Sequence, residues 1–422
     1  MPQQSSLTIV ADVRPGETES LGEILATMGD GVANGSVVDL SSLSEMHFAR
    51  FFLLEETTDL SGRPLPAALL YMSDFDVPKD RHLTELAGSP GIDRLFGHCE
   101  GYPAAGPTAD QRLAYLRAHT VKEQARYVNT IGRGSRQIRR EAELRDAIEG
   151  FLDRQLNEWA GRDPREIREA VRRFVAEEPS LAWARNPEDR PSLWWRLREG
   201  AHLVALPLLL LLLSPLLLLG APFYAFLLRR HEKADPAPHL KPDEATVTGL
   251  ARLEDHVVQN PFTAIGLVKP GLFRKLTIRG ILYAIAYATR HVFNNGNLAG
   301  VKTIHFARWV ILNEGRRVIF ASNYDGSLES YMDDFIDKIA WGLNVVFSNG
   351  FGYPRTRWLV LDGARDELAF KDYLRRHQVP TRVWYSAYQR LTASNVANNE
   401  RIRRGLYGDM GGEEARRWLQ AL

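Results

Sequence analysis

The chain has 422 residues, of which 45% are hydrophobic and 25% charged, and its formal net charge is +1. This length accommodates two or three domains, and the near-neutral charge argues against a dedicated nucleic-acid-binding protein. The single cysteine, Cys99, excludes an intrachain disulfide framework and cysteine-rich metal sites. Because the first residues lack the pattern of a secretory signal peptide, we expect the soluble parts to face the cytoplasm.

Taken in chain order, the first part of the sequence has the pattern of a small α+β unit. The predicted elements are strand 7–13, helix 19–28, strands 46–54 and 67–75, helices 81–96 and 109–118, and strand 121–128.

A charged linker follows, and then an apolar segment. Residues 139–178 have helical periodicity, with Asp163-Pro164 as a helix start. Residues 203–228 carry no charge, and this stretch exceeds the roughly 20 apolar residues that cross a bilayer. A buried core helix is the alternative, but the long leucine run favours a membrane segment.

The flanks of the apolar segment indicate how it sits in the membrane. Both flanks are basic, which predicts that both ends lie on the cytoplasmic side. Pro215 and Pro222 allow bends, and about 39 Å of helix is too short for two spans. We therefore expect a shallow in-plane hairpin or re-entrant anchor, with Trp194, Trp195 and Tyr224 at the headgroup level. The alternative is a single tilted span, with the barrel formed between two chains.

The last part of the sequence repeats the first. Its predicted elements are strand 262–268, helix 272–293, strands 303–312 and 317–324, a helix from 328, strand 358–361, a helix through 374 and strand 382–388. Four sequence matches occur in the same order in both parts, which predicts an internal duplication. The matches are 13–16 with 268–271, His47-Phe48-Ala49-Arg50 with His305-Phe306-Ala307-Arg308, 101–103 with 352–354, and 115–121 with 373–379.

The element order βαββαβ is the ferredoxin-like pattern. The predicted fold class is α+β, with two tandem ferredoxin-like units pairing sheet to sheet as an α+β barrel. The expected divisions are copy 1 at 1–138, a helical linker at 139–200, the membrane segment at 201–230, a Pro-rich linker with a short helix at 231–259, and copy 2 with a helical tail at 260–422.

In this duplicated order the chain resembles the dimeric α+β-barrel superfamily, and distantly the dye-decolorising peroxidases and chlorite dismutases. The resemblance implies a haem as one cofactor and an oxidoreductase of the peroxidase or monooxygenase type. The dye-decolorising peroxidases carry a Gly-x-x-Asp-Gly motif with a catalytic aspartate. The match here is partial, because Ser322 precedes Asp325-Gly326 in place of the glycine. That resemblance would make Asp325 and Arg308 catalytic.

Histidines and arginines in the repeated motifs are the other candidates. Because alternate residues of a strand face opposite ways, His305 and Arg308 are expected on opposite faces, one of them pointing between the sheets. That side chain is either a ligand or acid–base contact, or a structural group. His377 follows a helix, where it either caps the helix or binds a haem. Asp325 either caps the following helix or handles protons.

Two functions remain open. The first is a membrane-anchored oxidoreductase acting on an apolar or lipid-derived substrate. The second is a non-catalytic membrane-surface protein that binds a ligand or a partner. The expected partners are membrane lipid, a small apolar ligand or substrate and a second copy of the chain, with no nucleic acid.

Overall fold

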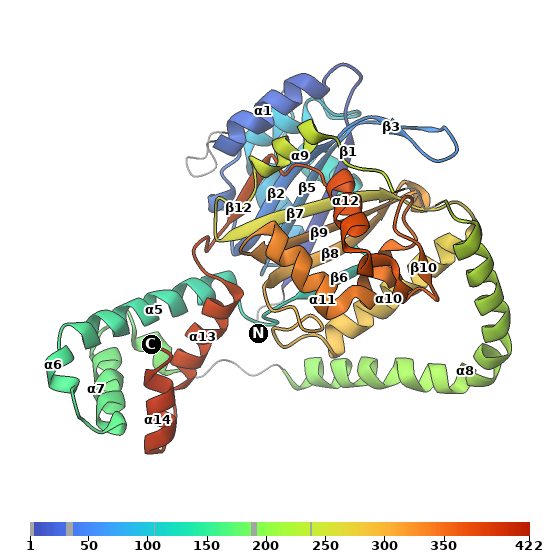
Figure 1. The fold of residues 1–422 in the computed structure, drawn as a ribbon. Coiled ribbons are helices and arrows are strands. Elements are labelled where there is room, and N and C mark those ends of the chain that lie inside the picture. Colours follow the sequence, from blue (N-terminus) through green and yellow to red (C-terminus); the bar gives the residue numbers. More distant parts are fainter. Residues whose placement is uncertain (1–3, 31–36, 105, 187–191, 237–238) are drawn as a thin grey trace.

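The computed structural model describes residues 4–30, 37–104, 106–186, 192–236 and 239–422. Its body is α+β and contains two four-stranded antiparallel sheets. Figure 1 shows these sheets crossing one above the other, a helical module to one side, and the long helix α8 (Leu193–Ala234) bent around the opposite side.

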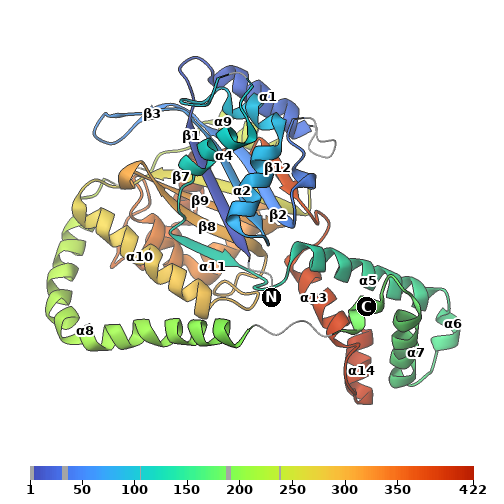
Figure 2. The same cartoon turned by 180° about the vertical axis from the view of Figure 1, so that it is seen from behind.

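The first sheet is covered on its outer face by the helices of copy 1, as the reverse view shows (Figure 2). Its strand order is β1 (Ser5–Asp12), β5 (Ala68–Phe75), β2 (Met46–Leu54) and β12 (Val383–Ser386). The covering helices are α1 (Thr18–Asp30), α2 (Lys79–Gly88), α3 (Asp93–Phe96) and α4 (Ala109–Ala118). Ile9, Phe51 and Tyr71 on the strands pack against Leu25 and Leu116 on the helices, and their burial fixes which face is the core side.

The second sheet is built in the same way. Its strand order is β6 (Ala125–Val128), β8 (Ile304–Leu312), β9 (Arg317–Asp325) and β7 (Gln259–Leu267). The outer face is covered by α10 (Leu272–His291), α11 (Leu328–Phe347) and α12 (Glu367–His377). Between the sheets, Phe52 and Met72 of the first pack with Val310 and Ile319 of the second.

Each copy gives its last strand to the sheet of the other copy. In a ferredoxin-like unit the last strand lies beside the first, but here β6 pairs with β8 and β12 pairs with β2. The two pairings have the same register, with Ala125 opposite Trp309 and Val383 opposite Phe51. The residues just before each last strand also form a single β-bridge with the first strand of their own copy, Thr120 with Ile9 and Gln378 with Ala264.

The predicted closed barrel is therefore wrong, although the α+β class and the face-to-face pairing are confirmed. The two sheets stay separate because the last strand leaves its own sheet after one bridge and satisfies the open edge of the other.

The repeat continues into the helical module. This module contains α5 (Ser135–Asp153), α6 (Leu156–Trp159), α7 (Pro164–Glu177), α13 (Ala393–Arg404) and α14 (Gly412–Leu419). Helix α5 follows β6 as α13 follows β12, and the buried pairs keep the offset of 258: Ile138 with Val396, Leu144 with Ile402, and Ile148 with Leu406. The predicted start of α7 is confirmed, since the Asp163 side chain accepts from the Arg165 amide at 2.8 Å.

Two predicted elements differ locally. The helix expected over 81–96 is broken into α2 and α3, because Pro90 cannot continue the α2 hydrogen-bond ladder. The strand expected over 358–361 is the turn of a small hairpin between β10 (Thr356–Arg357) and β11 (Leu361–Asp362). Trp358 and Leu359 have φ of 58° and 62°, in the left-handed region. The other short elements are β3 (Thr57–Thr58), β4 (Pro64–Leu65) and α9 (Glu244–Ala251).

The strand exchange predicts that a cut between the copies will not separate them. If a protease site replaces residues 187–191, the two fragments should still elute together in detergent, because each fragment supplies a strand to the sheet of the other. Size-exclusion chromatography after cleavage measures this. Separate elution of two folded fragments would contradict the exchange.

Candidate functional site

The two repeated His-Phe-Ala-Arg motifs meet between the sheets. They lie on β2 and β8, and both strands have a β-bulge at the histidine, between Met46 and Phe48 and between Ile304 and Phe306. The rings of Phe48 and His305 are 5.5 Å apart, and those of His47 and Phe306 are 5.2 Å apart. Each histidine ring thus meets the phenylalanine of the other motif across the inter-sheet space.

The expectation that His305 and Arg308 face opposite ways is therefore wrong. Arg308 also reaches the first sheet, so both side chains point between the sheets. The physical reason is the bulge, which adds a residue to one strand and breaks the two-residue alternation there.

Each motif histidine is bonded to an aspartate at the end of a neighbouring strand. His305 Nε2 lies 2.7 Å from Asp325 Oδ1, and His47 Nε2 lies 2.8 Å from Asp76 Oδ1. The second oxygen of each carboxylate accepts from the first amide of a helix: Ala393 of α13 donates to Asp325 at 2.7 Å, and Ser135 of α5 donates to Asp76 at 2.6 Å. Each carboxylate thus joins a strand histidine to a helix N-terminus, where negative charge is stabilised.

This arrangement corrects one part of the prediction for Asp325. Its carboxylate accepts from the first amide of α13, whose N-cap is Thr392, and it does not cap the following helix α11, whose cap is Ser327. Both oxygens of Asp325 are already bonded within the protein.

The two histidines differ at their other ring nitrogen. Tyr388 lies between them, and its hydroxyl is 2.9 Å from His47 Nδ1. Among the described residues, His305 Nδ1 makes no such hydrogen bond, although its ring centroid lies 6.2 Å from that of Tyr388. Burial raises the pKa of Tyr388 well above its usual value, so its hydroxyl stays protonated at pH 7. An imidazole held by a carboxylate, with one nitrogen unbonded, is an arrangement that can accept a proton.

Arg308 and Arg50 cross between the sheets in opposite directions. Arg308 donates to the backbone oxygens of Leu7 and Ser73 at 2.9 Å each, and pairs with Asp74 at 2.5 Å. Arg50 makes the equivalent bonds in the opposite direction, donating to Phe262 O at 2.8 Å, Ser322 O at 2.9 Å and the side chain of Asn323. Backbone oxygens of one sheet are thus bonded by a guanidinium of the other.

The two arginines have different partners, because Asp74 of copy 1 corresponds to Asn323 of copy 2. Arg308 therefore faces a carboxylate, whereas Arg50 faces a neutral amide. Burial, and then the nearby Arg308, lower the pKa of Arg50 to about 9, which still leaves it charged at pH 7. The donors of Arg308 are directed at strand backbone and Asp74, so its observed contacts are those of a group that holds the sheets together.

His377 lies away from this centre, at the C-terminus of α12. Its Nδ1 donates to Tyr373 O at 2.7 Å, and His119 makes the same bond to Tyr115 O at 2.8 Å at the end of α4. Burial lowers the pKa of His377 to about 4, so the ring is neutral at pH 7. Both copies therefore use this histidine to add a side-chain hydrogen bond to a carbonyl in the last turn of the helix.

Two hollows adjoin α12. The cavity beside His377 has a volume of about 30 Å³ and apolar walls that include Ile278, Val346 and Leu374. That is room for one water molecule, and a haem would require these walls to open. A polar groove of about 350 Å³ shares Tyr373 of α12 with this cavity, and its lining includes Arg355, Arg376, His239 and Asp366.

Comparison with known protein families, curated proteins and solved structures gives no match for this chain. The resemblance to the α+β-barrel enzymes stays a prediction, as does a haem at His377.

Sequence reasoning missed Asp76, Tyr388 and the two helix N-termini in this site. A signal for the helices was present, because the 258-residue offset that relates the histidine motifs also aligns Ser135 with Ala393. Nothing in the sequence pattern marks Tyr388, since copy 1 has Thr130 at the equivalent position.

Because Arg308 bonds the backbone of the opposite sheet, its replacement should cause a large loss of stability. Arg308→Met should lower the free energy of unfolding by about 3–5 kcal/mol, because Asp74 is left buried and unpaired. Adding Asp74→Leu should recover part of this loss. Chemical unfolding measures both. As a control, Arg117→Met removes the exposed partner of Asp80 and should cost less than about 1 kcal/mol. A loss equally small for Arg308→Met would contradict the structural role.

The buried ring of His377 predicts an unusual titration. The carbon signals of this ring, assigned by their loss in His377→Gln, should not move between pH 7.5 and 5, since its folded pKa of about 4 lies below that range. Because the unfolded imidazole has a pKa near 6.5, His377 should lower the stability of the fold as the pH falls from about 6.5 to 4, and have no effect above. NMR of histidine-labelled protein measures the titration of this ring. A midpoint near pH 6.5 would contradict the burial.

Proposed function

We propose that this protein is a monotopic membrane protein, held in one leaflet by the bent helix α8, and that its α+β body is a binding platform at the membrane surface. One observation carries the proposal: both ends of the exposed apolar helix are bonded to the same helix, α10.

The first end of α8 is fixed to the C-terminal part of α10. Arg290 donates to Glu199 at 2.5 and 2.7 Å, and His202 Nδ1 lies 2.7 Å from His291 Nε2. The Tyr287 hydroxyl donates to Leu203 O at 2.6 Å. These contacts hold this end of α8 to the body before the leucine run begins.

The second end of α8 is fixed to the N-terminal part of α10. The ring of Phe273 packs against Tyr224 at 5.3 Å and His231 at 4.8 Å between centroids. Beyond them, Asp235 pairs with Arg274 and, at 2.9 Å, with Lys269. Glu232 is buried and accepts from the backbone amides of the hairpin turn, Trp358 and Leu359.

The part of α8 between these attachments must bow outward. From Leu203 to Tyr224 a straight helix rises about 32 Å, whereas Thr277 and Tyr287, the contacts on α10, are about 15 Å apart. The bend in Figure 1 satisfies both lengths, and Pro207, Pro215 and Pro222 lie within this stretch. The resulting bow projects at most roughly 14 Å, which is within one leaflet of a bilayer whose core is roughly 30 Å thick.

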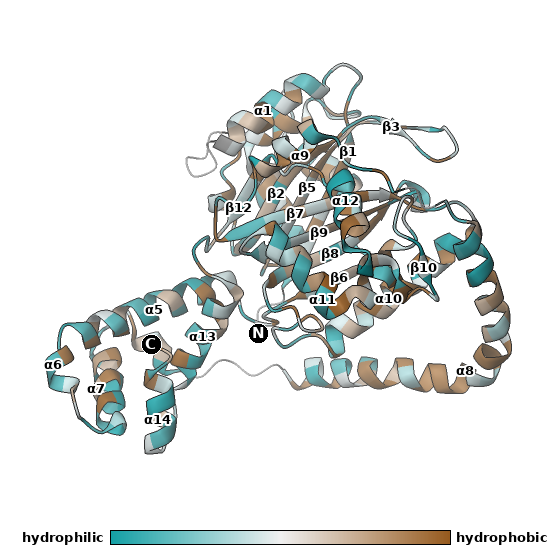
Figure 3. Ribbon diagram, in the orientation of Figure 1, coloured by the Kyte–Doolittle hydropathy of each residue, from teal (hydrophilic) through white to brown (hydrophobic). Residues whose placement is uncertain are grey.

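The bow is apolar and touches little of the body. An 18-residue window of α8 has a mean hydropathy of 2.6 and is 0% buried, which makes α8 long and apolar enough to cross a membrane by length and composition. Figure 3 shows it as a continuous brown stretch away from both sheets. A leucine surface of this kind on a soluble monomer would be an aggregation hazard, so a lipid environment is the simplest cover for it.

The backbone of the bow suits a lipid environment. All of Leu193–Ala234 is helical, so its amides are satisfied internally except where proline interrupts the ladder. Pro215 leaves the carbonyl of Leu211 without its usual donor, and the Ser214 hydroxyl donates to that oxygen at 2.7 Å. This removes the cost of one exposed carbonyl at the bend.

Binding at the membrane surface is the first candidate for the role of the body. The repeated arginines and aspartates are bonded within the protein, which supports a structural role for them. A peroxidase-like or monooxygenase-like oxidoreductase, acting on a lipid-derived substrate with a haem, is the second candidate. The observation that favours chemistry of any kind is His305, with Asp325 on one nitrogen and the other unbonded.

The proposed topology predicts that both ends of α8 lie on the same side of the membrane, and from the basic flanks we expect the cytoplasmic side. Single cysteines at Arg198 and Arg230 should both react with an impermeant maleimide added to that side, and a cysteine at Ser214 should be protected by the bilayer. Cys99 is 1% exposed and gives little background.

Mass spectrometry of inside-out and right-side-out vesicles reads the labelling, with a cysteine at exposed Arg117 as the control for the body. Labelling of the two ends from opposite sides would show a single span. Equal labelling of all sites in the absence of membrane association would overturn the proposal.

A further inference from the structure

We propose that the flanks of α8 bind the headgroups of anionic lipids, so that the anchor selects a negatively charged membrane surface. This inference rests on the monotopic anchor proposed above and adds the lipid class that it recognises.

The charges of α8 are segregated between its two sides. Its acidic residues are turned toward the body and neutralised there: Glu199 is paired with Arg290, and Glu232 is 2% exposed and paired with Arg229. Asp235, the cap that ends the helix, is paired with Lys269 and Arg274. All three carboxylates are thus paired on the body side, and only Glu199 has a further contact with an exposed cation of α8, Arg198.

All of α8 lies in the described part of the chain, and its exposed charged side chains are all cations. Arg196 and Arg198 lie before the apolar bow, and Arg230 and Lys233 lie after it. Arg198 has a distant contact of 3.7 Å with Glu199. Both flanks of the apolar segment thus place free positive charge at the depth where headgroups lie.

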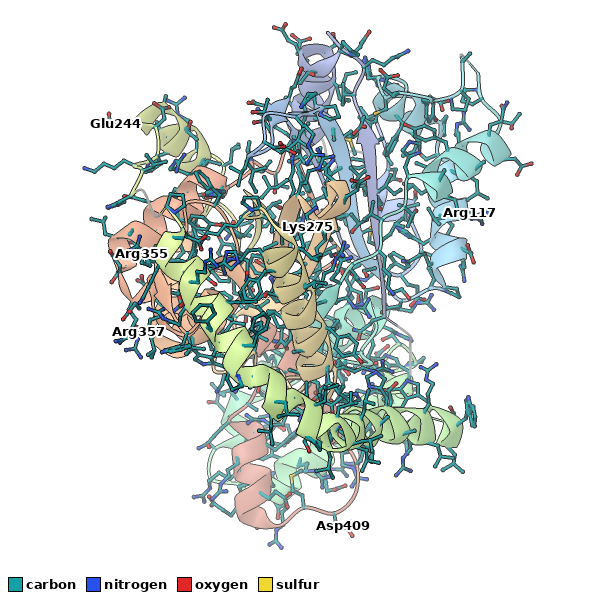
Figure 4. All side chains as sticks on the ribbon, turned by 90° about the vertical axis from the view of Figure 1, so that its right-hand side faces the viewer. Arg117, Glu244, Lys275, Arg355, Arg357 and Asp409 are labelled. Carbon is teal, nitrogen blue, oxygen red and sulfur yellow. The ribbon has the colours of Figure 1, made fainter. Side chains whose placement is uncertain are left out.

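Helix α10 adds to the same surface. It contains no acidic residue, and next to the stripe that contacts α8 it has a second stripe of exposed side chains, Leu272, Leu276, Arg279 and Tyr283. Figure 4 views this side of the molecule, with Arg355 and Arg357 near the later part of α8 and Lys275 on α10, where it donates to Glu314 O at 3.3 Å. In the hairpin next to it, Trp358 is exposed and lies under the guanidinium of Arg229 at 5.3 Å.

A surface with apolar side chains at its centre and cations at its edge matches an anionic bilayer in both respects. The apolar part enters the leaflet, and the cations remain at the headgroups. Each basic residue near an anionic surface strengthens attraction by about fivefold in the binding constant, and salt weakens it. Phosphatidylcholine, which has no net charge, lacks this contribution.

The test measures which lipids surround the anchor. The full chain, with Phe226→Cys labelled by bimane, is reconstituted into vesicles of phosphatidylcholine and phosphatidylglycerol in which one or the other carries brominated acyl chains. Bromine quenches the label on contact, so the ratio of the two quenching curves is the relative affinity. We expect an affinity several-fold higher for phosphatidylglycerol, falling toward one in 0.5 M salt.

The variant Arg230→Gln/Lys233→Gln should reduce the preference toward one. The matched control, Lys79→Gln/Arg117→Gln, removes two exposed cations on α2 and α4, which cover the outer face of the first sheet (Figure 2), and should leave the preference unchanged. Equal quenching by the two lipids in the unmodified protein would overturn the inference while leaving the membrane anchor intact. A preference that persists in the α8 variant would also overturn it. Quenching by neither lipid would show instead that the anchor itself is wrong.

Discussion

The exchange of last strands between the two copies is the constraint on which the rest of the structure depends. Neither sheet is complete without the other copy, since β12 closes the edge of the first and β6 the edge of the second. The same crossing is repeated in the side chains, where Arg50 and Arg308 each bond the backbone of the opposite sheet. Helices α5 and α13 then leave from the exchanged strands, and each is held by an aspartate that follows or ends a strand of its own copy, Asp76 for α5 and Asp325 for α13.

This exchange limits what the connection between the copies can do. The two sheets are joined within one chain and must stay on the same side of any membrane, so the apolar segment that connects them has to return to the side from which it started. A regular straight helix cannot do so. The observed solution is a proline-bent helix whose two ends are bonded to one helix of the body, with the carboxylates of α8 used for attachment and its free cations left outside.

The sequence alone predicts a large part of this fold, because its elements follow from local patterns. The repeat is visible in His47-Phe48-Ala49-Arg50 and its copy, and the strand 46–54 has the predicted bounds. The strand exchange cannot be predicted from the sequence, because the alternating side-chain pattern of β6 would fit the open edge of either sheet. The bulges at His47 and His305 also leave no local signal, which is why the sequence predicts His305 and Arg308 on opposite faces. For Asp325 the sequence predicts either a cap of the following helix or a proton-handling group, whereas its carboxylate bonds the first amide of α13, 68 residues later.

The central claim is that the ends of α8 stay together in the membrane. The most direct measurement is the distance between spin labels at Gly200 and Phe226 in lipid nanodiscs, by pulsed electron paramagnetic resonance. A bowed helix fixed to α10 predicts a distribution centred at about 25 Å, set by the attachment points along α10. A straight transmembrane helix would give about 39 Å. The longer distance in lipid would contradict the account, because the two ends could not then both remain bonded to α10.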